Sequence, residues 1–124
     1  MTKSAIVFAF LLFAICAWAQ NEHRVERITD GPRVKEVTET VAKIAWSTTA
    51  AGSSIVRYGF NPKELNQRAE EPWGGGHESN GNFNHTVWLK NLRPHTRYFF
   101  IVESGQARGT GTEAFSHVEE FHTR

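Results

Sequence analysis

Short segments in which apolar and polar residues alternate make up much of the chain after residue 19. In the clearest one, residues 40–48, the side chains of Ala42, Ile44 and Trp46 have the same parity, and this period of two indicates a β-strand with one buried face. Further segments of this kind, separated by Gly, Pro, Asn and Ser, lie at residues 54–59, 85–89 and 98–102. No comparable stretch has a helical period, so the pattern predicts an all-β chain.

The first and last predicted strands are irregular. The first, at residues 28–37, contains Gly31-Pro32. Because proline has no N–H to donate, this strand belongs at a sheet edge or contains a break. The last strand lies within residues 114–123, where Phe115 and Phe121 share their parity with polar residues. A β-bulge within this strand would resolve the conflict.

Glycine-rich segments mark the expected turns and loops. The turn-forming sequence Ala51-Gly52-Ser53 predicts that the strands on either side of it pair as a hairpin. Residues 70–82, which include Gly74-Gly75-Gly76, and residues 105–112, which include three further glycines, are predicted to be loops.

The N-terminal segment has the organisation of a secretory signal peptide. A basic residue precedes an uncharged apolar run at residues 5–18, and Ala17 and Ala19 put small residues before the expected cleavage site. The run is shorter than the roughly 20 apolar residues of a membrane span. We expect residues 1–19 to be a signal peptide and residues 20–124 to be one exported domain, periplasmic or secreted, that does not span the membrane. An uncleaved N-terminal anchor is the alternative.

Charge and cysteine content exclude several classes of function. The chain has 14 Lys+Arg and 13 Asp+Glu, and loss of Lys3 with the signal peptide would leave equal numbers of both. Without a basic surplus, we expect neither a nucleic-acid partner nor binding to an anionic membrane surface. The only cysteine, Cys16, also lies in the signal segment, so the core alone must stabilise the exported chain without a disulfide.

The sequence Leu92-Arg93-Pro94-His95-Thr96-Arg97-Tyr98 resembles the pattern that leads into strand F of fibronectin type III domains. In that family the tyrosine forms a tyrosine corner, its hydroxyl bonding to the backbone a few residues upstream, here near Leu92. Three further matches are in register with it: Trp46 with the tryptophan of strand B, Val56 and Tyr58 with the pair in strand C, and Phe121-His122-Thr123 with the end of strand G. The resemblance implies a seven-stranded, immunoglobulin-like antiparallel β-sandwich.

The chain is similar in more detail to the N-terminal fibronectin-like domain of purple acid phosphatases. The shared motifs are Gly31-Pro32 and the segments at residues 42–46, 56–59 and 85–89. In that family a metallophosphoesterase domain follows, whereas nothing follows Arg124 here. The resemblance therefore implies an accessory domain and no phosphatase activity.

The sequence contains no recognisable catalytic set. A dinuclear phosphoesterase needs several carboxylates and histidines, but Asp30 is the only aspartate of the chain. In the segment Gly81-Asn82-Phe83-Asn84-His85, Phe83 stands where the related metal-binding motif has a histidine. No serine lies in a Gly-x-Ser-x-Gly sequence, and no pair of histidines has the spacing of a zinc site. We therefore expect no enzymatic activity, no cofactor and no metal.

The histidines have structural interpretations. His85 shares its parity with Val87 and Leu89, which predicts a partly buried, hydrogen-bonded side chain. His117 and His122 are five residues apart, so a regular strand places them on opposite faces, and only a bulge would let them share an ion.

One predicted loop offers a candidate contact site. It contains Trp73 and His77 beside the glycine run, a composition suited to contact with a protein or a sugar. The alternative is that Trp73 folds back and covers the core. The sequence thus predicts a non-catalytic exported module that binds a protein or a glycan. The alternative is a stand-alone accessory domain of a purple acid phosphatase-like metallophosphoesterase encoded separately.

Overall fold

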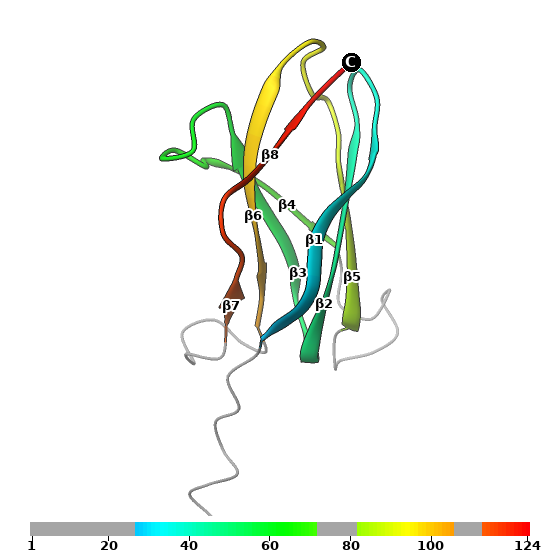
Figure 1. Ribbon diagram of the computed structural model, residues 1–124, viewed down its shortest axis with the longest axis vertical. Coiled ribbons are helices and arrows are strands. Elements are labelled where there is room, and N and C mark those ends of the chain that lie inside the picture. Colours follow the sequence, from blue (N-terminus) through cyan, green and yellow to red (C-terminus); the bar gives the residue numbers. More distant parts are fainter. Residues whose placement is uncertain (1–26, 72–81, 106–112) are drawn as a thin grey trace, which may run out of the picture.

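The computed structural model describes residues 27–71, 82–105 and 113–124. Within these ranges the chain forms eight β-strands in two antiparallel sheets that face each other (Figure 1). The strands are β1 (Ile28–Val37), β2 (Ala42–Gly52), β3 (Ser54–Gly59), β4 (Gln67–Glu71), β5 (Asn82–Leu89), β6 (Arg97–Ser104), β7 (Ala114–Phe115) and β8 (Glu119–His122). The predicted all-β sandwich is confirmed. No helix long and apolar enough to cross a membrane occurs in the described part of the chain.

One sheet has the order β1-β2-β5, and the other has the order β4-β3-β6, with β7 and β8 both paired to β6. The core lies between them and consists of the inward-facing side chains that alternate along the longer strands. Its members, all buried, are Ala42, Ile44, Trp46, Val56, Tyr58, Val87, Leu89, Leu92, Tyr98, Phe100, Val102 and Phe121. The faces predicted from the period of two are therefore the faces that pack.

The tyrosine corner is present. The backbone N–H of Arg93 donates a hydrogen bond to the hydroxyl of Tyr98 over 2.8 Å, and the Tyr98 ring stacks on Phe121. Next to it, the buried hydroxyl of Thr123 accepts from the Thr96 N–H at 2.9 Å and donates to the Arg93 carbonyl. The Tyr98 hydroxyl thus anchors the turn before β6, as the resemblance implied, and Thr123 ties residue 123 to the same turn.

The predicted hairpin around Gly52 and Ser53 is wrong. β2 pairs with β1 and β5, whereas β3 pairs with β4 and β6, so the turn carries the chain from one sheet to the other. The N–H of Ser53 bonds to the Gly105 carbonyl at 2.9 Å, which fixes this crossover to the end of β6. The local sequence of the turn does not distinguish a hairpin within one sheet from a crossover between two sheets, because contacts with the rest of each sheet decide which strands pair.

β4 was not predicted, and the predicted loop at residues 70–82 was too long. Glu70 and Glu71 belong to β4, and Asn82 begins β5. β4 pairs with β3 along its whole length, although Ala69 is its only apolar residue. Such a polar sequence carries no alternating apolar signal and is typical of an exposed edge strand.

The bulge predicted in the last strand is confirmed, and it explains why the structure has one strand more than expected. Glu103 pairs with Phe115, and Phe100 pairs with Glu119. A step of three positions in β6 therefore corresponds to a step of four positions in the strand that pairs with it. The extra residue falls between β7 and β8, where Ser116 bonds to the backbone of Val102 through both its N–H and its hydroxyl. The bulge divides one predicted strand into two.

β1 is an edge strand, as Gly31-Pro32 predicted, and its register with β2 shifts three times. Gly31 has a φ of 87°, and a Cβ at this position would lie 2.9 Å from the Ala45 carbonyl oxygen. Only glycine combines this backbone conformation with so close an approach to β2.

Candidate functional site

Trp73 and His77, the two residues singled out as a contact site, lie outside the described residues. The structure does place the ends of their segment, because Glu71 pairs with Ser54 and Asn82 pairs with Gly52. Both attachments lie at the end of the sandwich where the β2–β3 crossover is found, the lower end in Figure 1. We call this the loop end, and the contact site remains a prediction.

A buried polar group lies directly inside the loop end. We call it the hydroxyl cluster, and it consists of Trp46, Thr48, Ser54, His85 and Ser104. The imidazole of His85 is 1% exposed, stacks on the Trp46 indole at 5.0 Å, and lies within hydrogen-bonding distance of Thr48 Oγ1 (2.8 Å) and Ser54 Oγ (2.6 Å). Trp46 Nε1 donates to Ser104 Oγ over 2.8 Å. Every ring nitrogen of the cluster therefore has a partner.

The hydroxyl partners define the protonation of His85. Burial lowers the pKa of His85 from 6.5 to about 4, so the imidazole is neutral at pH 7, with one donor and one acceptor nitrogen. The only proton of the Thr48 hydroxyl points to the Ala50 carbonyl at 2.8 Å, so Thr48 Oγ1 accepts from His85 Nε2–H. His85 Nδ1 then accepts from the Ser54 hydroxyl.

This arrangement has the contacts of a nucleophile and a base, but not their accessibility. Ser54 donates to an imidazole, as a catalytic serine does, yet Ser54 is only 3% exposed. The second ring nitrogen contacts a hydroxyl, not the carboxylate that would stabilise an imidazolium. The prediction of a structural, hydrogen-bonded His85 is confirmed, and its burial is more complete than predicted.

The other histidines that the structure describes are not part of a recognisable metal-binding group. In the described ranges, no three His, Cys, Asp or Glu side chains come close enough together to hold an ion. The bulge lies between His117 and His122 and removes the parity argument that kept them apart. Nδ1 of His122 is bonded to the Thr123 carbonyl at 2.8 Å.

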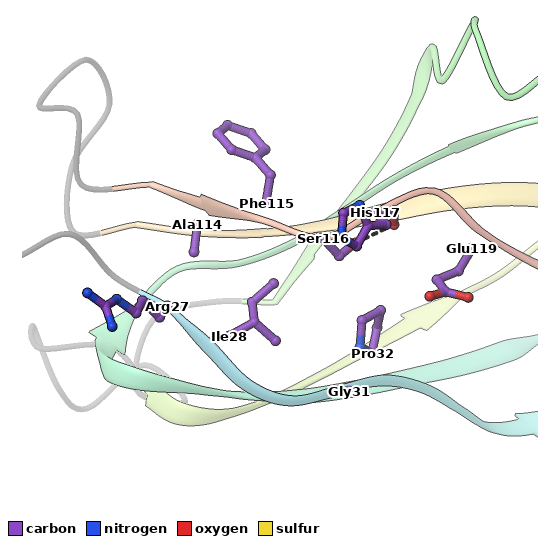
Figure 2. Close-up of a pocket in the computed structure, with 9 residues that line it drawn as sticks. All are labelled: Arg27, Ile28, Gly31, Pro32, Ala114, Phe115, Ser116, His117 and Glu119. Carbon is purple, nitrogen blue, oxygen red and sulfur yellow. Dashed lines mark hydrogen bonds between the residues drawn. The ribbon is translucent and has the colours of Figure 1, made fainter.

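A groove of about 450 Å³ lies along the seam between the two sheets, where the edge strand β1 faces the strands β7 and β8 (Figure 2). We call it the seam groove, and it was not found from the sequence. Its two walls come from the beginning and the end of the part of the chain that the structure describes. One wall consists of Arg27, Ile28, Gly31 and Pro32, and the other consists of Ala114, Phe115, Ser116, His117 and Glu119. The bulge between β7 and β8 forms the centre of the second wall.

The seam groove contains two charges that form no ion pair with the residues that the structure describes. Arg27 and Glu119 both line it, and neither side chain forms an ion pair with any residue that the structure describes. Beside it, Phe115 is 58% exposed and Val118 is 46% exposed. A surface that combines free charges with exposed apolar groups is typical of a contact surface.

A family model described as the N-terminal domain of purple acid phosphatase matches residues 33–123 of the chain. The chain belongs to this family. The match begins within β1 and runs to the end of β8, so it includes the hydroxyl cluster and the β7–β8 wall of the seam groove, but not the wall formed by residues 27–32. A search of curated proteins with this chain found no match.

Two solved structures are similar to this chain. The FN1–FN3 domains of chicken CNTN1 share 21% identity with it at a TM-score of 0.57, over 82% of this chain and 31% of that one. A fibronectin type III domain of human fibronectin type III domain containing protein 3 shares 20% identity at a TM-score of 0.50, over 80% and 84% of the two chains. The predicted fibronectin type III fold is confirmed.

Proposed function

We propose that the chain is a non-catalytic exported module that binds a protein or a glycan partner. The observation that supports this most directly is the seam groove, where Arg27 and Glu119 lie at an open surface without an ion-pair partner in residues 27–71, 82–105 and 113–124. The one histidine–serine pair that the described residues bring into contact, His85 and Ser54, is buried. The accessible polar groups are thus suited to recognition.

Binding is tested with the purified protein on two kinds of probe, a glycan array and a displayed library of random peptides. The proposal expects reproducible binding to members of one of these sets at micromolar concentration or better. A denatured sample of the same chain serves as the control. If the folded protein binds neither glycans nor peptides, this function is contradicted.

The loop-end contact site has its own test. Trp73→Ala should weaken any ligand found in these screens if Trp73 is exposed for contact, while the melting curve stays nearly unchanged. If the variant instead melts at a clearly lower temperature, Trp73 covers the core and the loop is not the contact site.

Export is supported by the organisation of residues 1–19 and is tested by mass spectrometry of the secreted chain. Cleavage after Ala19 predicts a mature N-terminus at Gln20. A chain that keeps its apolar run and sediments with membranes would support the uncleaved anchor.

The family match favours one specific partner as a second candidate, a metallophosphoesterase encoded separately. In this case the chain acts as an accessory domain that shields or orients the active site of the enzyme. A neighbouring gene for a metallophosphoesterase without its own N-terminal domain would support this. The decisive assay measures phosphatase activity of that enzyme with and without this chain, and no change in kcat or KM would reject it.

A further inference from the structure

The two free charges of the seam groove have opposite sign and different positions. Arg27 lies just before β1, near Ala114, whereas Glu119 begins β8 on the far side of the bulge, near Pro32 (Figure 2). Phe100, the partner of Glu119 in β6, faces the core, so the Glu119 carboxylate lies on the inward face at the edge of the sandwich. A ligand that neutralises both charges must carry a basic group and an acidic group at separate points.

Apolar side chains line part of the groove between these charges. Ile28 and Pro32, both half-buried, point into it from β1, and the buried Ala114 lies opposite (Figure 2). The hydroxyl of Ser116, the polar side chain nearest the centre, already accepts from the Val102 N–H and donates to the His117 carbonyl. The side chains of Ile28, Pro32 and Ala114 can therefore receive an apolar group. The volume of the whole groove lies in the range of about 300 to 1,000 Å³ in which ligand pockets fall.

From this pattern we propose that the seam groove binds a short peptide segment of a partner protein, in which an apolar side chain lies between an acidic and a basic one. The acidic side chain pairs with Arg27, the basic one pairs with Glu119, and the apolar one packs on Ile28 and Pro32. The inference rests on the proposed binding function and names the site and the class of partner.

A glycan fits the groove less well. Sugar rings usually stack on an aromatic face. Apart from the His117 imidazole, Phe115 is the only aromatic side chain among the residues that line the groove. Its ring points away from Ile28 and Pro32 (Figure 2). A neutral sugar would also leave the Arg27 and Glu119 charges without partners. A peptide supplies both charges.

Recognition is expected through side chains and not through addition of a β-strand. A partner strand needs a continuous row of backbone N–H and C=O groups at the sheet edge. β1 interrupts this row with its register shifts and with Pro32, and the bulge at Ser116 interrupts it between β7 and β8. Sequence specificity therefore depends on the charged and apolar side chains of the peptide.

The experiment selects peptides from a random displayed library on the purified protein and measures the affinity of synthetic copies. The selected peptides should share one apolar residue flanked by an acid and a base. Glu119→Lys and Arg27→Glu should each weaken their binding by about tenfold or more, because each removes a charge-assisted contact. Exchanging the matching charge of the peptide should restore binding to the corresponding variant.

Glu120→Lys is the matched control for Glu119→Lys. It makes the same change of charge one residue further along β8, on the outward face opposite Phe99, and should leave the affinity within about twofold. Lys35→Glu is the corresponding control for Arg27→Glu within β1. Both variants are exposed and are expected to fold.

Each other outcome overturns the inference. Peptide binding that withstands both groove variants places the site elsewhere and leaves the proposed binding function intact. Glycan binding that Glu119→Lys abolishes assigns the groove to a sugar. Self-association in sedimentation that the same variant abolishes assigns it to a second copy of this chain. Absence of any binding contradicts both the inference and the proposed function.

Discussion

The hydroxyl cluster and the seam groove both lie at the interface between the two sheets, but their polar groups differ in burial and in hydrogen-bond or ion-pair partners. In the cluster, His85 is enclosed and both of its nitrogens bond to hydroxyl groups of the same domain. In the groove, Arg27 and Glu119 are exposed and have no ion-pair partner in the part of the chain that the structure describes. The hydroxyl cluster is a buried network whose ring nitrogens all have hydrogen-bond partners, and the seam groove has the composition of a contact surface.

The difference teaches where to look for function in a domain of this kind. A histidine in contact with a serine in a structure suggests chemistry. However, a buried polar group that is fully hydrogen-bonded contributes mainly to a unique core. Charges that are left at an open groove contribute little to stability and are available for recognition. Stability and binding measurements should therefore separate the two regions.

The largest effect is expected for Trp46→Ala. This change removes the ring that stacks on His85 and the donor to Ser104, and it leaves a large cavity in the core. We expect a loss of about 3 to 5 kcal/mol in the free energy of unfolding, measured by chemical denaturation. A loss below about 1 kcal/mol would mean that the cluster is not part of the core.

The second prediction concerns the pH dependence of stability. Because the pKa of His85 is about 4 in the folded chain and near 6.5 in the unfolded chain, the unfolded state binds more protons between these values. Stability from this group is present above pH 6.5, falls as the pH drops towards 4, and is fully lost below 4, by about 3 kcal/mol in total. His85→Gln removes the titration, and the variant should lack this part of the pH slope.

The comparison of the two pH profiles isolates His85 from the carboxylates, which titrate in the same range in both proteins. Identical slopes for the parent and His85→Gln would show that the imidazole is solvated, and the contrast with the seam groove would disappear.

A smaller effect is expected at the tyrosine corner, an internal polar contact outside the cluster. Tyr98→Phe keeps the ring but removes the hydroxyl that accepts from the Arg93 N–H. We expect a loss of about 1 kcal/mol, measured as a lower denaturation midpoint. A midpoint equal to that of the parent would indicate that this hydrogen bond does not stabilise the corner.

The smallest effect on stability is expected in the seam groove. Glu119→Lys should change the free energy of unfolding by no more than about 0.5 kcal/mol, because the exposed carboxylate forms no ion pair with a residue that the structure describes. Urea denaturation of the variant and of Glu120→Lys provides the comparison. A loss above about 1 kcal/mol at Glu119 alone would make it a structural residue.

Much of the fold was predictable because the core strands alternate strictly. The faces that contain Trp46, Val56 and Val87 followed from parity, and Tyr98 with its upstream motif identified the corner. β4 was missed because its polar sequence has no inward apolar row. The hairpin was mispredicted because local turn residues do not determine which strands become neighbours.

The candidate site was less predictable for a physical reason. The seam groove forms where residues near Arg27 face residues near Glu119, at opposite ends of the described chain, and no local pattern encodes that approach. One signal was available: the parity conflict around Phe115 and Phe121 predicted the bulge whose residues form one wall. The residues chosen from composition, Trp73 and His77, lie outside the described part of the chain.

The most direct test of the account is an NMR titration of the ¹⁵N-labelled protein with a selected peptide. The seam groove predicts that the largest shift changes occur at the backbone amides of Ile28, Gly31, Ser116 and Glu119, while the amides of Ser54 and His85 remain nearly unchanged. Changes concentrated around Ser54 and His85, with the groove amides unaffected, would contradict it.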